Sequence, residues 1–329
     1  MRPDVDALLP AGLLPARLRE VVLQCARGDL PPNVGLMQIF MAAADRGEGE
    51  RTLAAAHASM QRGGARDAAT RLQAMMDLWR RTPEAYDIVT SVLSIEQPGF
   101  SQPDWGSVFD RAAEISPEAG VALYSLGSPA LLDAATAEII ERMRTWDLLG
   151  ADRTLLEIGC GIGRCVEKLA GEMHFAVGID VSQRMLERAR ARCAGIDRLA
   201  LLRSSGRDLS AFGDASFDVV LAVDSFPYLV RSGRELAAGH IREARRVLKP
   251  GGSLLILNFS YRGDGEADRA EIARLARESQ FDVRRNGTRE FALWDGLAFL
   301  LRRSDGEHTQ RDRSRKKPRH GGRLAVAEG

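Results

Sequence analysis

Leu155-Leu-Glu-Ile-Gly-Cys-Gly-Ile-Gly-Arg164 is the stretch of sequence on which the fold prediction rests. A short apolar run ends in the acid Glu157 and passes directly into three alternating glycines. Because glycine has no Cβ, the backbone can turn sharply there and a ligand can approach the main chain closely. We therefore predict a strand, a glycine-rich turn and then a helix, whose first free amides favour a polar or anionic ligand group.

The spacing of the glycines distinguishes this turn from the common dinucleotide-binding turn. That motif places its third glycine at position 164, where this chain has Arg164, and the third glycine here is Gly163. The acid Glu157 is also a poor neighbour for a pyrophosphate and a good one for a cationic ligand. A nicotinamide-dependent oxidoreductase is therefore disfavoured.

From Arg153 onward, short aliphatic runs alternate with amphipathic helical segments. This alternation is typical of a parallel sheet covered by helices on both faces. We predict an α/β fold with a doubly wound, seven-stranded, mostly parallel sheet. The predicted strands are Thr154–Ile158, Phe175–Asp180, Leu199–Arg203, Phe217–Val223, Ser253–Phe259, Phe281–Thr288 and Phe291–Arg302. The predicted helices between them lie near Gly163–Ala170, Gln183–Cys193, Arg234–Leu248 and Ala267–Ser279. The last two strands leave no room for a helix and should pair antiparallel.

The N-terminal part of the chain has a different character. Between Leu13 and Ser94, apolar residues recur at helical spacing, interrupted by breakers such as Pro31–Pro32 and Gly63–Gly64. We predict a small all-helical domain of four or five helices at residues 1–96. Residues 97–150 should form a linker and two helices leading into the fold, near Trp105–Glu114 and Pro129–Trp146. Residues 151–303 should form the α/β domain, and residues 304–329 a disordered basic tail.

The composition limits the kinds of partner. Acids and bases nearly cancel to a net charge of +1, which argues against attraction of the whole protein to nucleic acid or to an anionic membrane. No apolar run approaches the length of a bilayer span, and the first residues do not resemble a secretory signal. The cysteines and histidines lack the paired spacing of metal sites. We therefore expect a cytoplasmic protein that needs no metal and binds neither nucleic acid nor a membrane.

A second candidate binding residue ends the second predicted strand, in Val177-Gly-Ile-Asp-Val-Ser182. A carboxylate at this place, Asp180, can accept hydrogen bonds from both hydroxyls of a ribose. Ser182 is placed to cap the next helix. With the glycine turn upstream, this pattern favours a ligand that carries a nucleoside.

Four segments now occur in order and at fitting intervals: Glu157-x-Gly-x-Gly-x-Gly163, Gly178-Ile-Asp-Val-Ser182, Ser216-Phe-Asp-Val-Val220 and Arg246-Val-Leu-Lys-Pro-Gly-Gly252. Together they resemble the class I S-adenosylmethionine-dependent methyltransferases. The resemblance covers about residues 151–303, roughly half of the chain, and implies S-adenosylmethionine as the cofactor.

The resemblance also implies roles for individual residues. The methionine part of the cofactor would be held by Glu157, Gly159, Cys160, Gly161 and Gly163. Asp180 would bind the ribose, and Val181 and Met185 would pack near the adenine. Asp208, flanked by Gly206 and Arg207, would accept a hydrogen bond from the adenine amino group. The commonest pattern of the family has an acid where this chain has Gly206, so the acid falls two residues later here.

The candidate substrate side follows the fourth predicted strand, in Ala222-Val-Asp-Ser-Phe-Pro-Tyr228. Open parallel sheets present side chains to ligands at the carboxyl ends of their strands. Asp224 and Tyr228 are therefore the catalytic candidates, Asp224 also borders the cofactor, and Ser225 faces the substrate. Ser225-Phe-Pro-Tyr228 is similar to the Asn/Asp/Ser-Pro-Pro-Tyr motif of enzymes that methylate exocyclic amines of nucleobases, but lacks the first proline. In similar enzymes the segment before the first strand folds over the cofactor, so Tyr124, expected to be exposed, is a candidate lid residue. The alternative is a tyrosine packed at the junction of the two domains.

The leading functional hypothesis is direct methyl transfer to a small molecule, with the helical domain as a cover for the substrate. The donor in such a reaction is already activated, so the protein mainly aligns the nucleophile and excludes water. One alternative is a methyltransferase that acts on a protein or RNA docked by the helical domain. Another is a non-catalytic S-adenosylmethionine-binding regulator or partner subunit. Association into a homo-oligomer through the helical domain is compatible with each of them.

Overall fold

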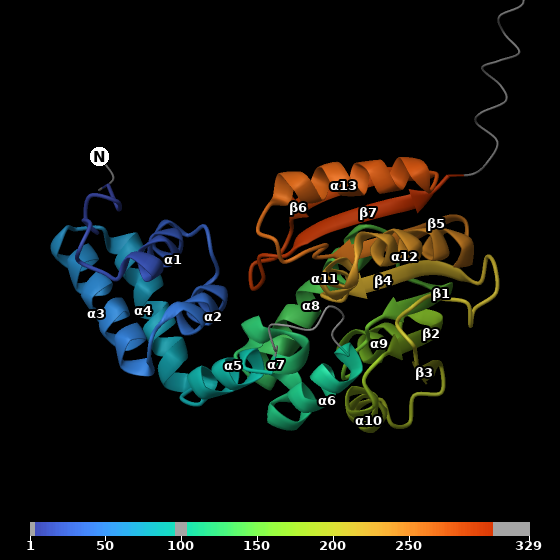
Figure 1. The fold of residues 1–329 in the computed structure, drawn as a ribbon, viewed down its shortest axis with the longest axis horizontal. Coiled ribbons are helices and arrows are strands. Elements are labelled where there is room, and N and C mark those ends of the chain that lie inside the picture. Colours follow the sequence, from blue (N-terminus) through green and yellow to red (C-terminus); the bar gives the residue numbers. More distant parts are fainter. Residues whose placement is uncertain (1–3, 96–103, 305–329) are drawn as a thin grey trace, which may run out of the picture.

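The computed structural model describes residues 4–95 and 104–304. A bundle of helices forms one end of the molecule and an open sheet with its covering helices forms the other (Figure 1). The predicted linker at residues 97–103 and the predicted tail, from residue 305, lie outside the described residues.

The N-terminal bundle consists, within the described residues, of the five helices α1 (Ala16–Arg27), α2 (Pro32–Ala42), α3 (Arg46–Arg62), α4 (Arg66–Arg81) and α5 (Ala85–Leu93). Gly28 ends α1 in a left-handed conformation, and the Asp45 side chain caps α3. Phe40 packs edge-on against Trp79 with ring centroids 4.7 Å apart. The prediction of a helical N-terminal region is confirmed.

Four short elements connect this bundle to the sheet: α6 (Trp105–Ile115), α7 (Pro117–Val121), the 3-10 turn η1 (Leu123–Ser125) and α8 (Pro129–Thr145). Each α-helix of this group is capped at its N-terminus by a polar side chain that accepts a hydrogen bond from a backbone amide. The capping residues are Asp104, Ser116 and Ser128. The sequence predicted α6 and α8 but not α7 or η1. Helices as short as α7 leave too weak a periodic signal to be recognised.

The sheet contains β1 (Gly150–Ile158), β2 (Met173–Asp180), β3 (Leu199–Arg203), β4 (Phe217–Val223), β5 (Leu248–Leu257), β6 (Phe281–Arg289) and β7 (Leu297–Arg303). Their order is β3-β2-β1-β4-β5-β7-β6, and β7 pairs antiparallel with both of its neighbours. The predicted seven-stranded, mostly parallel sheet is confirmed, including the antiparallel final pair. The strand order reverses between β1 and β4, which is where open sheets of this kind bind ligands.

Several predicted strand boundaries were wrong. β1 and β5 begin four or five residues earlier than predicted, and β7 begins at Leu297 rather than Phe291. Residues 291–296 instead form a loop held against α8, because the Glu138 carboxylate accepts hydrogen bonds from the amides of Ala292 and Leu293, at 3.0 and 3.1 Å. Those amides are therefore not available to a strand ladder.

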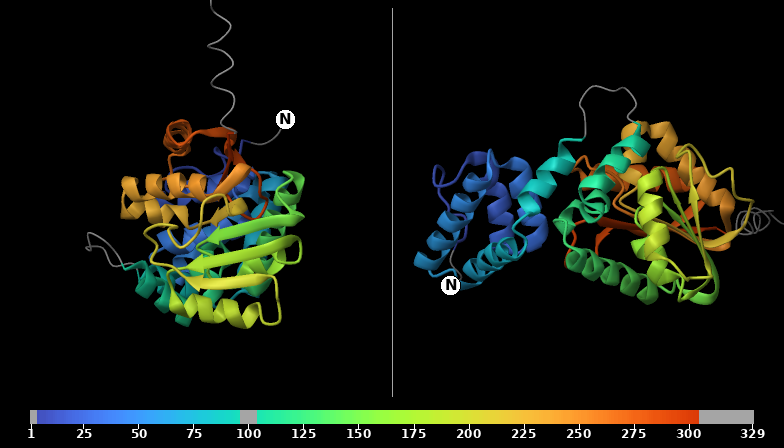
Figure 2. Two further views of the ribbon diagram at one scale, coloured as in Figure 1. Left: turned by 90° about the vertical axis from the view of Figure 1, so that its right-hand side faces the viewer. Right: turned by 90° about the horizontal axis from the view of Figure 1, so that it is seen from below.

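The helices of the sheet region are α9 (Arg164–Leu169), α10 (Gln183–Arg192), α11 (Phe226–Ser232), α12 (Arg234–Val247) and α13 (Gly265–Glu278). The sequence did not predict α11, although Pro227 suits the first turn of a helix. The helices α12 and α13 lie on the opposite side of the sheet from α9 and α10 (Figures 1 and 2).

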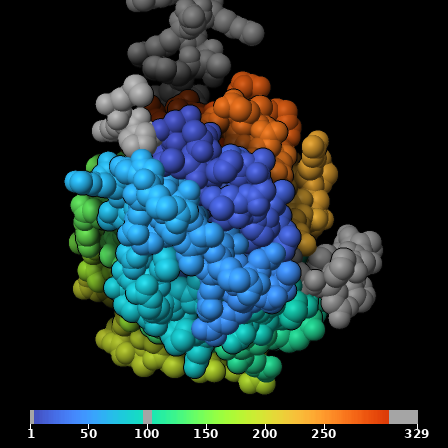
Figure 3. All heavy atoms as spheres, turned by 90° about the vertical axis from the view of Figure 1, so that its left-hand side faces the viewer, coloured from blue at the N-terminus to red at the C-terminus, as the bar shows by residue number. Residues whose placement is uncertain are grey.

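Two hydrophobic cores form because alternate residues of each strand face opposite sides of the sheet. Leu156, Val220 and Leu254 pack with α11, α12 and α13. Leu155 and Leu255 belong to the other core, which continues through α8, α9 and α10 into all five helices of the N-terminal bundle. Seen from the bundle end, the N-terminal helices cover most of that face of the molecule (Figure 3). The bundle is thus joined to the sheet region by shared core.

Candidate methyl-transfer site

The glycine turn after β1 has the sharp geometry that its sequence predicts. Gly159 and Gly161 adopt left-handed conformations, with φ of +73° and +53°. A Cβ on Gly159 would lie 2.5 Å from the Ser225 side chain, and one on Gly161 would lie 2.5 Å from Val121 in α7. These positions therefore need glycine both for the backbone conformation and for the close approach of neighbouring segments.

Asp180 lies at the carboxyl end of β2, next to this turn. Its two carboxylate oxygens accept backbone hydrogen bonds from Gly161, at 2.7 Å, and from Ser182, at 2.9 Å. Burial raises the pKa of Asp180, whereas the backbone amides act in the opposite direction. Asp180 therefore fixes the turn and retains free lone pairs for a ligand hydroxyl.

Glu157, at the end of β1, is buried and one of its oxygens, Oε2, has no hydrogen-bond partner. Burial raises its pKa to about 8, against the opposing effect of the nearby Arg164 guanidinium. Arg164 is itself buried and donates to the hydroxyls of Thr136 and Tyr124, at 3.1 and 3.2 Å. No described carboxylate lies within ion-pair distance of Arg164. A buried acid and a buried base thus lie near each other, each with capacity for a charged ligand.

The segments before β1 fold over this turn. Trp105, Phe109 and Val121, from α6 and α7, line the same cavity as the glycine turn. Asp110 of α6 accepts hydrogen bonds from the Ser182 hydroxyl, at 2.5 Å, and from the Arg184 amide, at 2.9 Å. These contacts fasten α6 to the start of α10 and so position the cover.

The expectation of an exposed Tyr124 was wrong. Its side chain is only 4% exposed, stacks on Trp294 with ring centroids 5.5 Å apart and accepts a hydrogen bond from Arg164. The position of Tyr124 at the junction with the N-terminal bundle explains this burial. Its part in a lid stays a prediction, and α6 and α7 supply the cover that the structure does describe.

A first cavity of about 580 Å³ collects most of the predicted cofactor residues. Its lining includes Glu157, Gly159, Cys160, Gly161, Asp180, Val181, Met185, Gly206, Arg207, Asp224, Ser225 and Tyr228. Gly163 is not in the lining but begins α9 directly behind it, in a left-handed conformation. The ends of three neighbouring strands, β2, β1 and β4, thus contribute to a single cavity.

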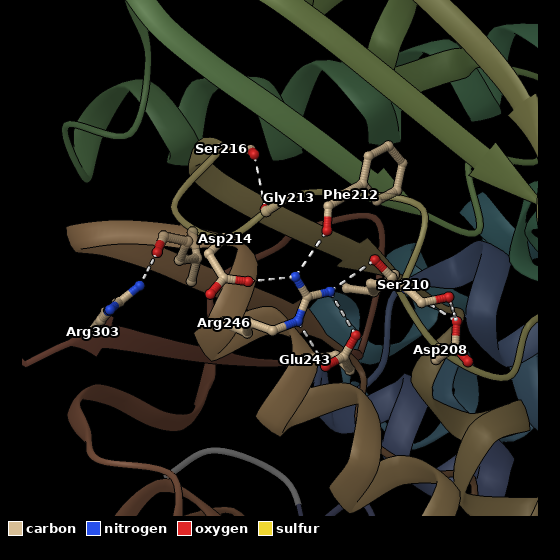
Figure 4. A network of polar contacts seen from close by, with 11 residues as sticks. Asp208, Ser210, Phe212, Gly213, Asp214, Ser216, Glu243, Arg246 and Arg303 are labelled. Carbon is tan, nitrogen blue, oxygen red and sulfur yellow. Dashed lines mark hydrogen bonds and ion pairs between the residues drawn. The ribbon is translucent and has the colours of Figure 1, made fainter.

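Asp208 does not line the first cavity, which corrects its predicted contact with an adenine. Its carboxylate accepts hydrogen bonds from the Ser210 amide, at 3.0 Å, and hydroxyl, at 2.6 Å (Figure 4). Nearby, Arg246 binds Glu243 and the Leu209 carbonyl and holds this loop against α12 (Figure 4). The acid falls two residues late in the sequence and bonds within its own loop instead of lining the cavity.

Asp224, directly after β4, is the most constrained residue of the site. It has a φ of +53°, and Asn258, directly after β5, has a φ of +71°. Strained residues of this kind are enriched at functional sites. The Oδ1 atom of Asp224 accepts hydrogen bonds from the Asn258 side chain, at 3.1 Å, and the Tyr261 hydroxyl, at 3.3 Å. Burial raises the pKa of Asp224 to about 6, although Arg164 and both hydrogen bonds lower it.

A second cavity, of about 950 Å³, adjoins the first. The lining residues shared by both cavities are Phe109, Gly120, Val121, Asp224 and Tyr228. One wall of the second cavity comes from the N-terminal bundle, through α2 and α5. The opposite wall comes from the segment after β5 and the loop before β7. Asp224 therefore lies where two sizeable cavities meet.

Comparison with known proteins identifies the kind of domain that holds this site. Residues 156–256 match the family model described as a methyltransferase domain. The sheet region is a class I S-adenosylmethionine-dependent methyltransferase domain. The matched segment runs from the end of β1 to the end of β5 and so includes the glycine turn, Asp180 and Asp224.

Three relatives illustrate the range of similar proteins. A demethylmenaquinone methyltransferase of Tropheryma whipplei (strain Twist) is 36% identical over 34% of this chain and 44% of its own length. The 27-O-demethylrifamycin SV methyltransferase of Amycolatopsis mediterranei is 35% identical over 40% of this chain and 47% of its own. The 2-methyl-6-phytyl-1,4-hydroquinone methyltransferase of Synechocystis is 32% identical, over 39% of each chain. The chain thus spans less than half the length of these relatives.

S-adenosylmethionine is the cofactor of such a domain, and the first cavity fits it. The unpartnered oxygen of Glu157 suits the ammonium of the methionine part, and the buried Arg164 suits its carboxylate. Asp180 has acceptor capacity left for the ribose hydroxyls. The cavity therefore offers a complementary group to the ammonium, the carboxylate and the ribose of the cofactor.

Sequence reasoning missed Arg164, Asn258 and Tyr261. The sequence pattern marks Arg164 only as the residue that stands where the dinucleotide-binding motif has its third glycine. Asn258 and Tyr261 follow β5 and so occupy the same edge of the sheet as Asp224. The rule that singled out Asp224 after the fourth strand would have found them after the fifth.

The described residues contain no group of acidic, cysteine or histidine side chains placed to hold a metal ion. Within the same residues, no helix is both long enough and apolar enough to cross a membrane.

Proposed function

We propose that this chain is an S-adenosylmethionine-dependent methyltransferase that methylates a small molecule bound in the second cavity. The observation that carries the proposal is that both cavities share Asp224 and Tyr228. A ligand in the first cavity and an acceptor in the second would therefore meet at one carboxylate. The volumes of both cavities lie in the range usual for small-molecule sites.

When bound, the cofactor supplies a methyl group on a positively charged sulfur. Glu157 and Arg164 hold its charged end, and Asp180 holds its ribose. The cover formed by α6 and α7 keeps water out of the cavity. Water would otherwise compete with the acceptor for the methyl group. Asp224 orients the acceptor and takes up a proton when the acceptor carries one. A carboxyl with a pKa of about 6 is suited to this task, since it is ionised at neutral pH and still basic enough to accept a proton.

A small acceptor is favoured over a protein or RNA for a structural reason. The N-terminal bundle, predicted as a cover for the substrate, contributes one wall of the second cavity, so an acceptor bound there would lie between two walls of the same chain. The relatives described above are named for methylation of demethylmenaquinone, of a rifamycin and of a phytyl hydroquinone, which are small molecules. Both observations support the first hypothesis over docking of a macromolecule.

The test of this function is calorimetric titration of the full chain with S-adenosylmethionine, S-adenosylhomocysteine and NADH in parallel. We expect micromolar binding of the two adenosyl ligands and no binding of NADH. Binding of NADH alone would overturn the proposal. Binding of the adenosyl ligands without methyl transfer to any acceptor would favour the regulator or partner-subunit alternative.

A further inference from the structure

The second cavity is unusually rich in aromatic side chains. Three of the four tyrosines of the chain, Tyr124, Tyr228 and Tyr261, line it together with Phe109 and Trp294. Phe109 and Tyr261 each meet Tyr228 edge-on, with ring centroids 4.9 and 5.7 Å apart. Aromatic rings prefer edge-to-face and offset-stacked neighbours, so a surface of this kind selects for another ring.

Part of this lining is apolar surface that the described residues leave uncovered. The large hydrophobic side chains that are exposed in the described part of the chain include Tyr261, at 51%, and Met41, at 52%. Both line the second cavity, Tyr261 near Asp224 and Met41 on the wall formed by the N-terminal bundle. Apolar surface is therefore uncovered both near the reactive end of the cavity and on its far wall.

The far wall is aliphatic and adaptable. Its aliphatic members are Leu30, Met37, Met41, Val92, Leu93 and Ile95, and the polar residues Gln24 and Gln38 complete it. Methionine side chains have three rotatable bonds and adjust to irregular apolar partners. This wall therefore suits a flexible or branched apolar substituent and offers no charge to a polar one.

At the reactive end, the side chain of Asp224 has one carboxylate oxygen to offer. The Oδ1 atom of Asp224 is engaged by Asn258 and Tyr261, and no described side chain donates to Oδ2. The acids nearby are largely committed, because Glu266 pairs with Arg269, at 2.7 Å, and Asp268 pairs with Arg262. The geometry thus provides, beside the aromatic surface, a proton acceptor held in place by Asn258 and Tyr261, and Asp295 is a second carboxylate in the lining of the same cavity.

We propose, on the basis of the function proposed above, that the methyl acceptor is a hydroxylated aromatic ring that carries an apolar substituent. The ring lies beside Tyr228 and Tyr261, its hydroxyl faces Asp224, and the substituent extends to Met37 and Met41. The hydroxyl oxygen forms the new bond to the methyl carbon as the bond from that carbon to sulfur breaks, with S-adenosylhomocysteine as the co-product. The proton of the hydroxyl passes to Oδ2 of Asp224 and then to solvent.

The first experiment measures binding of four simple probes to the full chain by calorimetry, without cofactor: phenol, nonylphenol, decanol and dodecylamine. We expect nonylphenol to bind about tenfold or more tightly than either phenol, which lacks the tail, or decanol, which lacks the ring. Equal binding of nonylphenol and decanol would overturn the assignment of a ring. Tighter binding of dodecylamine would overturn it in favour of a cationic acceptor.

Two variants separate the two ends of the cavity. Met41→Asp should weaken nonylphenol binding about tenfold and leave phenol binding within about twofold, because only the tail reaches α2. Leu13→Asp is the matched control, since Leu13 is also exposed in the N-terminal region but lines neither cavity, and it should change neither affinity. Equal effects of both variants would overturn the position of the tail.

The transfer itself is tested with labelled S-adenosylmethionine and nonylphenol, with the product identified by mass spectrometry. A methyl ether would support the proposal, and a product methylated on carbon or no product would overturn it. Titration with S-adenosylhomocysteine in the same preparation tests the methyltransferase function separately. If the cofactor binds but nonylphenol does not, only the proposed class of acceptor is contradicted. If nonylphenol binds but the cofactor does not, the methyltransferase function is contradicted, and with it the role of the phenol as acceptor.

Discussion

The first cavity is built from the ends of neighbouring strands and the turns that follow them, whereas the second lies between two distant parts of the chain, with aliphatic side chains of the N-terminal bundle on one wall and aromatic and charged side chains on the other. In the first cavity, Gly159, Gly161 and Asp180 are fixed by backbone conformation and by short hydrogen bonds. In the second, Met41 and Tyr261 are half-exposed. A rigid cavity selects one ligand by its charges, and a cavity with an adaptable apolar wall selects a class of ligands by shape and area. The predictions below test this division, beginning with the largest effect.

Replacing Asp224 by Asn should act on the acceptor side alone. The amide keeps the shape of the side chain but cannot accept the proton, so we expect turnover to fall by about 100- to 10,000-fold. Affinity for S-adenosylhomocysteine, measured by calorimetry, should change by less than about threefold. Loss of cofactor binding in this variant would assign Asp224 to the cofactor site. It would also contradict the proposal that Asp224 acts only on the acceptor.

The same carboxylate predicts a pH dependence. Burial and Asp295 raise the pKa of Asp224 to about 6, while Arg164, Asn258 and Tyr261 act to lower it. Below pH 6 the carboxyl is protonated and cannot act as a base, so the rate at saturating cofactor should rise with pH through about 6. A rate that is flat between pH 5 and pH 7 would exclude Asp224 as the base.

Replacing Asp180 by Ala should act on the cofactor side alone. We expect S-adenosylmethionine affinity to fall at least about tenfold, as for loss of a charge-assisted contact of about 1.5–3 kcal/mol. Asp208→Ala is the control, because the Asp208 carboxylate binds Ser210 outside the cavity and should be neutral for cofactor binding. An equal loss of affinity in both variants would support the contact between Asp208 and the adenine that its sequence position suggested.

Asn33 joins the two regions, and its replacement by Ala tests how far the acceptor wall depends on the N-terminal bundle. Its buried side-chain amide donates to the carbonyls of Tyr124 and Leu293, at 2.9 Å each. We expect Asn33→Ala to lower the free energy of unfolding by about 1–2 kcal/mol, measured by urea denaturation, because two buried carbonyls lose their donor. Nonylphenol binding should weaken as the bundle loosens, while cofactor affinity stays the same. A parallel loss of cofactor affinity would mean that the two cavities are not independent.

The smallest expected effect is a proton released on cofactor binding. Burial raises the pKa of Glu157 to about 8, so at pH 7 the side chain is mostly protonated without ligand. The ammonium of the cofactor favours the carboxylate, so binding should release close to one proton and affinity should increase as pH rises toward 8. Calorimetry in buffers of different ionisation enthalpy measures this release, and Glu157→Gln should abolish it. A release that persists in the variant would assign the proton to another group.

The same division explains how much the sequence could predict. The strand–turn–helix pattern and the strand-end acid Asp180 are local features, with causes that lie within a few residues, so the sequence predicted the sheet and most of the first cavity. Asp208 is the exception among the predicted residues of the first cavity. The orientation of its side chain depends on the hydrogen bond with Ser210 within the same loop.

The second cavity was less accessible to prediction because its walls come from distant parts of the chain. Met41, Tyr228 and Trp294 line the same cavity but are separated by long stretches of sequence. Their aromatic and aliphatic character matches ordinary core residues, and only the packing of the N-terminal bundle against the sheet region brings them together. The sequence did predict that this bundle covers the substrate, and that role remains a proposal.

The shared core of the bundle and the sheet has a consequence for synthesis of the chain. Leu18, Val22 and Leu36 leave the ribosome early, but their core also contains Leu255 and Leu300, which are made more than two hundred residues later. Until then the nascent helices present apolar surface that chaperones must shield. Expressed by themselves, the first 96 residues should therefore be prone to aggregation, and a circularly permuted chain that begins at the sheet should fold with less assistance.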